Sequence, residues 1–192
     1  MEFNKSTPSF LSENELANLK RVSEIDNQVN LIFDDFVISS ATEKHIKEIA
    51  ELWANLASIQ QISLPGRYDF KKEEKDWQTF VRNKLSKKHN LLLVTHKKDE
   101  NEIKGFLYLQ TITIPSSDLV LKAVIEDIYT KPQYRRLNIA SKLLDIALDW
   151  SLGQNIKQVD FISLVNAKDL SSFYLNFLKK FKKDISLDLV TF

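Results

Sequence analysis

The order of strand-like and helix-like segments after residue 90 constrains the fold of this chain more than any other feature. Residues 90–95, 103–114 and 119–130 are rich in β-branched and aromatic residues and are separated by short polar turns, which predicts three consecutive antiparallel strands. From residue 132 onward, apolar residues at helical spacing alternate with short apolar runs, which predicts helix, strand, helix and strand. Because strands joined through a helix pair in parallel, the sequence predicts an α/β fold with a mixed, mostly antiparallel sheet of six to seven strands and helices on both faces.

The segment before residue 90 predicts the remaining elements. Residues 36–41 form a strand candidate, Thr42 is placed to cap a following helix, and a second helix is indicated by four apolar residues at helical spacing, Trp77, Phe80, Val81 and Leu85. Residues 1–35 predict a polar tail and an appended helix, in which Ser12 and Glu15 make a capping-box pattern before Leu16, Leu19, Val22, Val29 and Ile32. We therefore divide the chain into an appended segment, 1–35, and a main domain, 36–192.

Charge and composition exclude several classes of function. The chain has 192 residues with 27 basic and 26 acidic side chains, so its formal charge of +1 gives no overall field for binding a nucleic-acid backbone. It contains no Cys, which excludes disulfides, a thiol nucleophile and Cys-based metal sites, and its three His lie far apart. No apolar run is long enough to span a bilayer and no signal peptide is apparent, so we expect a cytoplasmic protein without metal, membrane or nucleic-acid partners.

The stretch from residue 124 to residue 144 carries the chemistry. A strand passes through a turn into a helix whose first residues are small or basic, and the unpaired N–H groups of a helix N-terminus attract anions. Small residues at Asn138, Ala140 and Ser141 let an anion approach the backbone, while Arg135 and Arg136 add positive charge. An ordinary solvated helix start is the alternative interpretation.

These residues resemble the signature of the GNAT acetyltransferases, in which a strand is followed by P-x-Y-R and then R/Q-x-x-G-x-G/A at the start of a helix. The matching positions are Pro132, Tyr134, Arg135, Asn138 and Ala140. The likeness extends over residues 36–192, because the order of the other elements is also similar to that family, and it points to the small-amine or diamine-type members.

Two departures from the family pattern affect the site. Asn138 stands where the family has its first glycine; Asn adopts the left-handed conformation more readily than other non-glycine residues, but its side chain would crowd a bound diphosphate. Downstream, Asn166 and the Phe173-Tyr174 pair are one residue farther apart than usual, so the register of Tyr174 is shifted.

The resemblance implies acetyl-CoA as cosubstrate, with its pantetheine arm in a gap between the strands at 124–130 and 159–165. Backbone groups near Ile128 would bind the arm and polarise the thioester, and N–H groups of the turn would bind the diphosphate. The cofactor-binding residues implied in this way are Ile128, Tyr129, Thr130, Arg135, Arg136, Asn138, Ile139, Ala140, Ser141 and Asn166. Asn166 has an alternative role as a simple turn former.

Two residues are candidates for proton transfer. Glu126 matches a carboxylate that acts as base in diamine-type members, and strand alternation would place it on one face with Val124, Ile128 and Thr130, while Asp127 faces away. Tyr174 resembles the tyrosine that donates a proton to the departing thiolate. The alternatives are an ion-paired carboxylate for Glu126 and a core aromatic for Tyr174.

The sequence thus predicts an acetyl-CoA-dependent N-acetyltransferase that transfers the acetyl group directly to a primary amine of a small molecule or peptide. Residues 58–70 and 111–117 are the segments expected to contact the acceptor. The rival function is a catalytically silent acyl-CoA-binding or protein-interaction module with the same fold. The resemblance to this family also suggests a homodimer.

Overall fold

The computed structural model describes residues 29–61, 74–87, 89–114, 120–163, 168–180 and 185–191. Its strands form one sheet in sequence order: β1 (Asn30–Phe33), β2 (Phe36–Ser40), β3 (Leu91–Lys97), β4 (Ile103–Ile114), β5 (Val120–Thr130), β6 (Gln158–Ser163) and β7 (Ser186–Thr191). The helices are α2 (Ile46–Gln61), α3 (Glu74–Leu85), α4 (Ile139–Gly153) and α5 (Lys168–Lys180), with short 3-10 turns η1 (Glu43–His45) and η2 (Pro132–Tyr134). The mixed α/β fold predicted from the sequence is confirmed.

The direction of each strand follows from the connection that precedes it. The strands from β1 to β5 pair antiparallel, and the polar turn between β3 and β4 is short enough to make a hairpin. The β6 strand pairs parallel to β5, and β7 pairs parallel to β6, because α4 and α5 carry the chain back across the sheet before each of these strands.

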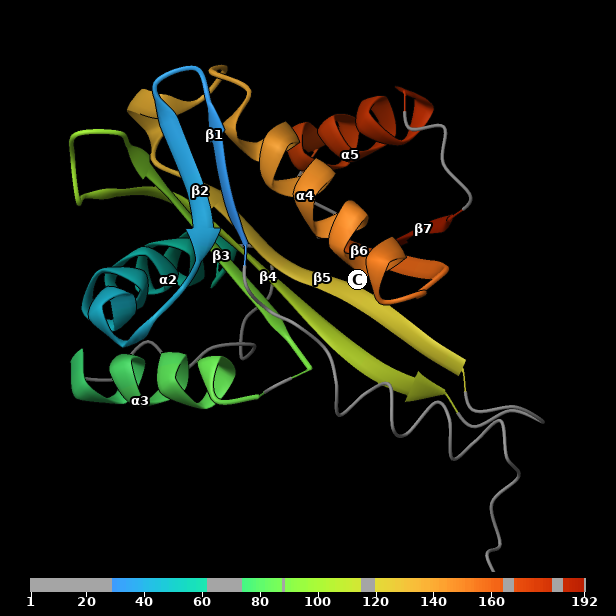
Figure 1. Cartoon of the computed structure of the whole chain (residues 1–192), viewed down its shortest axis with the longest axis horizontal. Helices are drawn as coiled ribbons and strands as arrows, with labels where there is room; N and C mark the ends of the chain where they lie inside the picture. The colour runs from blue at the N-terminus through green and yellow to red at the C-terminus, as the bar shows by residue number, and fades with distance from the viewer. Residues whose placement is uncertain are drawn as a thin grey trace, which may run out of the picture.

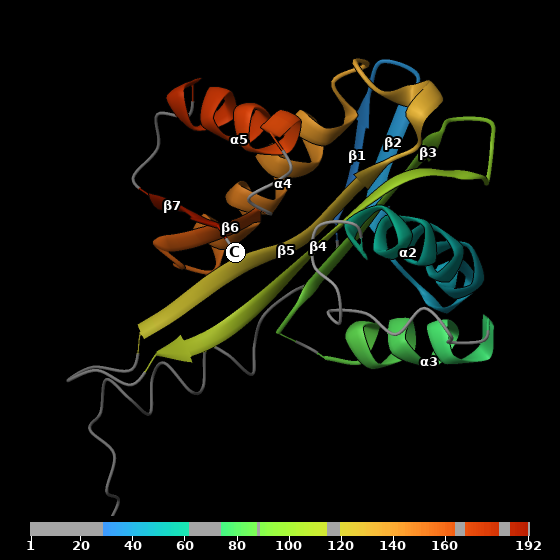
Figure 2. The ribbon, with the colours of Figure 1, turned by 180° about the vertical axis from the view of Figure 1, so that it is seen from behind.

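Helices cover both faces of the sheet, as Figures 1 and 2 show from opposite sides. The α2 and α3 helices pack on one face, where Trp53 and Val81 are completely buried against Phe106 and Tyr108 of β4. The α4 and α5 helices pack on the other face, where Leu143, Leu144 and Tyr174 join an apolar core. Each face therefore has its own core, and the sheet separates them.

Two β-bulges interrupt the pairing of the central strands. In β4, Gly105 pairs with Thr95 and Ile103 pairs with His96, so Lys104 is an extra residue without a cross-strand partner. In β5, Asp127 pairs with Tyr108 and Ile125 pairs with Leu109, so Glu126 is an extra residue in the same way. A bulge bends its strand and changes the direction of the side chains near it.

The structure differs from the sequence prediction just before the main domain begins. Val29 and Ile32 were expected in a helix, but Asn30–Phe33 is a strand paired with β2, because Asp34, at φ 46°, turns the chain into a hairpin between Phe33 and Phe36. The α4 helix ends at Gly153, and the left-handed residue beyond it is Asn155, at φ 56°. Within the described part of the chain, no helix has the length and apolar character that crossing a membrane requires.

Candidate active site

The turn between β5 and α4 adopts the conformation that an anion site requires. Pro132 begins η2, and two residues later in the turn, Arg136 and Asn138, take the left-handed conformation at φ 65° and 59°. This conformation is the one that Asn was expected to supply in place of the family glycine, and that prediction is confirmed. The left-handed Arg136 was not predicted, because arginine carries no sequence preference for positive φ.

The first turn of α4 leaves backbone donors directed out of the helix. Its first helical hydrogen bond runs from the Lys142 N–H to the Asn138 carbonyl, at 3.0 Å, so the N–H groups of Ile139, Ala140 and Ser141 precede the helical ladder. The Asn138 side chain makes no capping bond to them. Arg135 is exposed beside them, and its Nε donates to the Thr130 carbonyl at 3.2 Å. This donor set fits a diphosphate.

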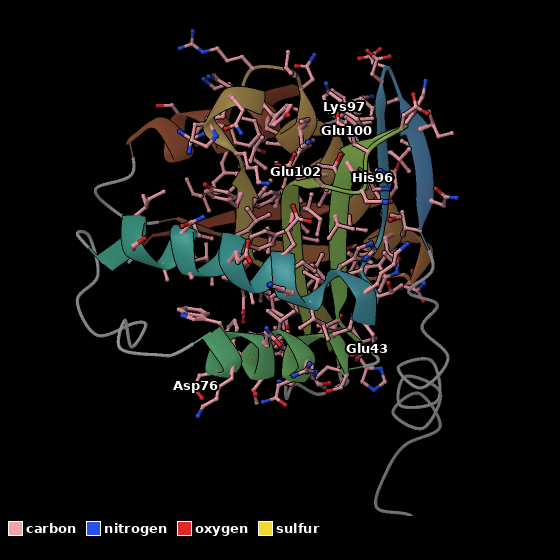
Figure 3. The ribbon with its side chains drawn as sticks, turned by 90° about the vertical axis from the view of Figure 1, so that its left-hand side faces the viewer. Glu43, Asp76, His96, Lys97, Glu100 and Glu102 are labelled. Atoms are coloured by element: carbon pink, nitrogen blue, oxygen red, sulfur yellow. The ribbon has the colours of Figure 1, made fainter. Side chains whose placement is uncertain are left out.

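A charged cluster fixes the β5 end that leads into this turn. Lys104 is completely buried, its Nζ lies 2.5 Å from a carboxylate oxygen of each of Glu100 and Glu102, and it stands 4.9 Å from the centre of the Tyr134 ring. Lys131 also pairs with Glu102, at 2.6 Å. Figure 3 shows Glu100 and Glu102 beside Lys97 at the turn between β3 and β4. Tyr134 is thus held against the sheet.

The charges in this cluster shift each other's titration. Hydrogen bonds from Lys104, and then from Lys131, lower the pKa of Glu102 to about 2. Burial alone lowers the pKa of Lys104, but its hydrogen bonds to Glu100 and Glu102 outweigh that effect and raise the pKa above its ordinary value. The cluster therefore remains ionised across the physiological pH range.

Gly105 lets β4 and β5 approach each other at this end. A Cβ atom at Gly105 would lie 2.6 Å from the Tyr129 carbonyl oxygen, a distance that real Cβ atoms do not adopt. The neighbouring Thr130 Oγ1 is buried and makes no hydrogen bond within the described part of the chain. A buried, unsatisfied hydroxyl at the end of β5 is consistent with a ligand partner at this position.

The β5 and β6 strands separate along their length. They pair only from Ala123 to Ile125 on β5, opposite Val159 to Phe161 on β6, although β5 continues to Thr130. The β5 strand stays paired with β4 over its whole length, from Val120 to Thr130, and Figure 1 shows these two long arrows side by side. Within the described range of β6, which ends at Ser163, the β5 backbone from Glu126 onward is therefore not paired with it, and the family resemblance implied such a separation.

Glu126 lies where this pairing ends, and its side chain faces α3. Its Oε2 accepts a hydrogen bond from Lys84 Nζ at 2.7 Å, and both side chains are largely buried, with exposed fractions of 23% and 17%. The prediction that Glu126 shares a face with Ile128 and that Asp127 faces away is wrong. Because Glu126 is the bulged residue, Asp127 also points toward the α2 and α3 side, while Ile128 packs against the opposite core.

Buried polar groups surround Glu126 that sequence reasoning did not identify. Asp127 is 3% exposed and accepts a hydrogen bond from Trp53 Nε1 at 3.0 Å. Asn90 Nδ2 donates to the Tyr108 hydroxyl, and Lys84 Nζ lies 4.3 Å from the centre of the Tyr108 ring. Burial, and then the negative charge of Glu126, raises the pKa of Tyr108. The described residues include no group of three or more His, Asp or Glu side chains able to bind a metal.

Tyr174 approaches the same region from the opposite face. Its ring packs on Phe161 of β6 with 5.1 Å between ring centres, and only 1% of the residue is exposed. Burial, and then the charge of Asp127, raises the pKa of its hydroxyl. Tyr174 therefore belongs to the apolar core, and Asp127 is the β5 carboxylate that affects the pKa of its hydroxyl. Asn166, most of the segment at 58–70 and the part of 111–117 after Ile114 lie outside the described residues.

Solved structures of known proteins share this fold. A transcriptional regulator from Bacillus halodurans C-125 is 20% identical, with 77% of this chain and 93% of that chain covered at a TM-score of 0.61. A predicted acetyltransferase with acetyl-CoA from Clostridium acetobutylicum is 18% identical, with 77% and 90% covered at a TM-score of 0.57. An aminoglycoside 6′-N-acetyltransferase from Acinetobacter baumannii is 16% identical, with 78% and 92% covered at a TM-score of 0.57.

The match to a family model is the stronger finding. No curated protein matches the chain in sequence. The acetyltransferase (GNAT) family model, however, matches residues 53–177, a range that includes the second half of α2, both bulges, the turn before α4 and Tyr174. The chain therefore belongs to the GNAT acetyltransferase family and is an acetyltransferase that uses acetyl-CoA.

Proposed function

We propose that this enzyme transfers the acetyl group directly to a primary amine of a small molecule or peptide. The observation that carries the proposal is the placement of Glu126. Its carboxylate stands where β5 leaves β6, and it already binds one alkylammonium group, that of Lys84, at 2.7 Å. A carboxylate in that position suits an acceptor amine, which must lose a proton before its nitrogen has a lone pair for attack.

The turn before α4 supplies the binding groups in this proposal. The backbone N–H groups from Arg136 to Ser141 would hold the diphosphate, and Arg135 adds a positive charge beside them. When bound, acetyl-CoA supplies an activated acetyl group as its thioester. The Ile128 and Thr130 backbone would bind the pantetheine arm, and a backbone N–H near Ile128 would stabilise negative charge on the carbonyl oxygen.

Two side chains have separate roles, Glu126 at the acceptor amine and Tyr174 at the leaving sulfur. Glu126 takes the proton of the acceptor ammonium, directly or through water, from the face covered by α2 and α3. Tyr174 would act on the leaving sulfur from the other face. Because its pKa is raised, Tyr174 holds its proton more firmly than a thiol does, so we expect it to donate a hydrogen bond to the sulfur rather than to release the proton completely. With no Cys in the chain, an acetyl-thiol intermediate on the protein is excluded.

Calorimetry and an acceptor panel test this proposal. We expect acetyl-CoA to bind, and CoA to be released with at least one member of a panel of diamines, aminoglycosides, amino acids and short peptides. Arg135→Glu should abolish acetyl-CoA binding, because it places like charge beside the diphosphate. The matched control is Arg82→Glu, the same charge change on the exposed side of α3, which should bind as the wild type does. Binding without turnover on any amine would instead favour the silent acyl-CoA-binding module.

A further inference from the structure

The ammonium group of Lys84 is held in the environment that an acceptor amine needs. Lys84 lies in the last turn of α3, and its Nζ is 2.7 Å from the Glu126 carboxylate. The same nitrogen lies 4.3 Å from the ring centre of Tyr108 and 5.5 Å from that of Phe80. A carboxylate and two aromatic faces together bind a primary alkylammonium well, and here that group belongs to the protein itself.

The position of this nitrogen along β5 matters as much as its surroundings. The last β5 residue paired with β6 is Ile125, so Glu126 and the amine it holds stand where the β5 backbone becomes available to the pantetheine arm. In the proposed function, on which this inference rests, the thioester lies near Ile128, two residues farther on. The Lys84 amine is therefore placed next to both the base and the acetyl donor.

We propose that Lys84 is an acetyl acceptor and that the enzyme acetylates itself at this residue. Glu126 takes a proton from the Lys84 ammonium, and the freed lone pair of Nζ attacks the thioester carbonyl carbon. The C–N bond forms, the C–S bond breaks with its electron pair leaving on sulfur, and the second proton is lost from nitrogen. The overall balance is lysine ammonium plus acetyl-CoA giving Nε-acetyl-lysine, CoA thiol and one proton.

Ion pairing alone does not select Lys84. Lys122 is similarly buried, with 15% of its side chain exposed, and it pairs at 2.5 Å with Asp160, which lies on the stretch of β6 that is paired with β5. Lys142 is 46% exposed on α4 and lies 4.0 Å from Asp145. Uncatalysed acetylation by acetyl-CoA would favour the exposed Lys142, whereas catalysed acetylation should favour Lys84. The acetylation rates of Lys84 and Lys142 can thus be compared within one protein.

The experiment measures the acetylation of Lys84 and of Lys142 in the full-length chain. The protein is incubated with acetyl-CoA and no acceptor, and acetylation is measured over time by intact mass and peptide mapping at several protein concentrations. We expect Lys84 to be modified well before Lys142, with a rate constant that does not depend on protein concentration. Glu126→Gln should slow Lys84 acetylation about a hundredfold and leave Lys142 unchanged. Lys84→Arg, which keeps the positive charge, should bind acetyl-CoA and gain no acetyl group at that position.

The outcomes separate this inference from the proposed function. If added amines are acetylated while Lys84 is modified no faster than Lys142, or if Glu126→Gln leaves Lys84 acetylation unchanged, self-acetylation is wrong and the proposed function stands. A rate constant that rises with protein concentration would show transfer between molecules and would also overturn it. If acetyl-CoA does not bind the wild type, both the inference and the proposed function fail.

Discussion

The two bulges of the central sheet use the same local device for different purposes. Each removes one charged residue from the pairing of its strand, Lys104 in β4 and Glu126 in β5, and each of these residues finds an ion-pair partner. Lys104 is completely buried between two carboxylates and an aromatic ring, whereas Glu126 keeps 23% of its side chain exposed and has one lysine partner. Both charges are paired within the protein, but Glu126 is the more exposed and has the single ion-pair partner that an acceptor amine would replace in the proposed function.

The difference shows how surroundings assign a role to a charged residue. Lys104 is linked through Glu102 to Lys131 and lies against the ring of Tyr134, at the end of β5 that leads into the turn before α4. Glu126 stands at the point where the β5 backbone leaves β6. We therefore assign Lys104 to stability and Glu126 to the reaction, and the predictions below test that division.

The largest effect is expected at Glu126. Glu126→Gln keeps the size of the side chain but removes its ability to accept a proton, so kcat should fall about a hundredfold or more. Acetyl-CoA affinity should change little, because Glu126 lies outside the turn that we propose binds the diphosphate. Steady-state kinetics together with calorimetry check both expectations. Wild-type kcat in this variant would assign Glu126 to structure and remove the contrast between the bulges.

The reverse pattern is expected at Lys104. Lys104→Met removes the charge at the centre of the cluster and should lower the free energy of unfolding by about 1–2 kcal/mol, a modest loss because Glu100 and Glu102 are partly exposed and regain water. Urea unfolding measures this change. The kcat of the folded variant should stay close to that of the wild type. A large loss of kcat with unchanged stability would contradict the assignment.

A smaller effect is expected in the turn itself. Asn138→Gly removes a side chain from a left-handed position, so acetyl-CoA should bind more tightly, by less than about tenfold. The kcat of this variant should not change. Asn138→Gly would then alter affinity without altering kcat, whereas Glu126→Gln would alter kcat without altering affinity. Calorimetry with the two variants side by side measures the difference. Unchanged affinity would mean that the turn already accommodates the Asn side chain.

The smallest effect concerns acid stability. The pKa of Glu102 is about 2 in the folded protein and about 4.3 in an unfolded chain, so its ionised form stabilises the fold above the higher value. That contribution is lost as the pH falls toward 2, and it is under about 1 kcal/mol because half of the side chain is exposed. Lys104→Met should therefore flatten the dependence of Tm on pH in this range. An equally steep dependence in the variant would show that the pairing of Glu102 with Lys104 does not contribute to it.

Sequence patterns predicted the parts of the molecule that depend on local chemistry. The strand and helix order followed from periodicity, and the left-handed turn at Asn138 followed from the preference of Asn for that conformation. The bulge at Glu126 turns Asp127 toward α2 and α3. It does not disturb the alternation of buried and partly buried residues along β5, so no periodic pattern could have predicted the direction of Asp127. The contact between Lys84 and Glu126 joins residues 42 positions apart, and no local pattern encodes it.

A crystal structure of the protein with acetyl-CoA tests the central claim most directly. We predict the diphosphate on the backbone N–H groups between Arg136 and Ser141, with the acetyl group beside Ile128 on the side of Glu126. A coenzyme bound elsewhere, or an acetyl group out of reach of Glu126, would contradict the account of how this enzyme works.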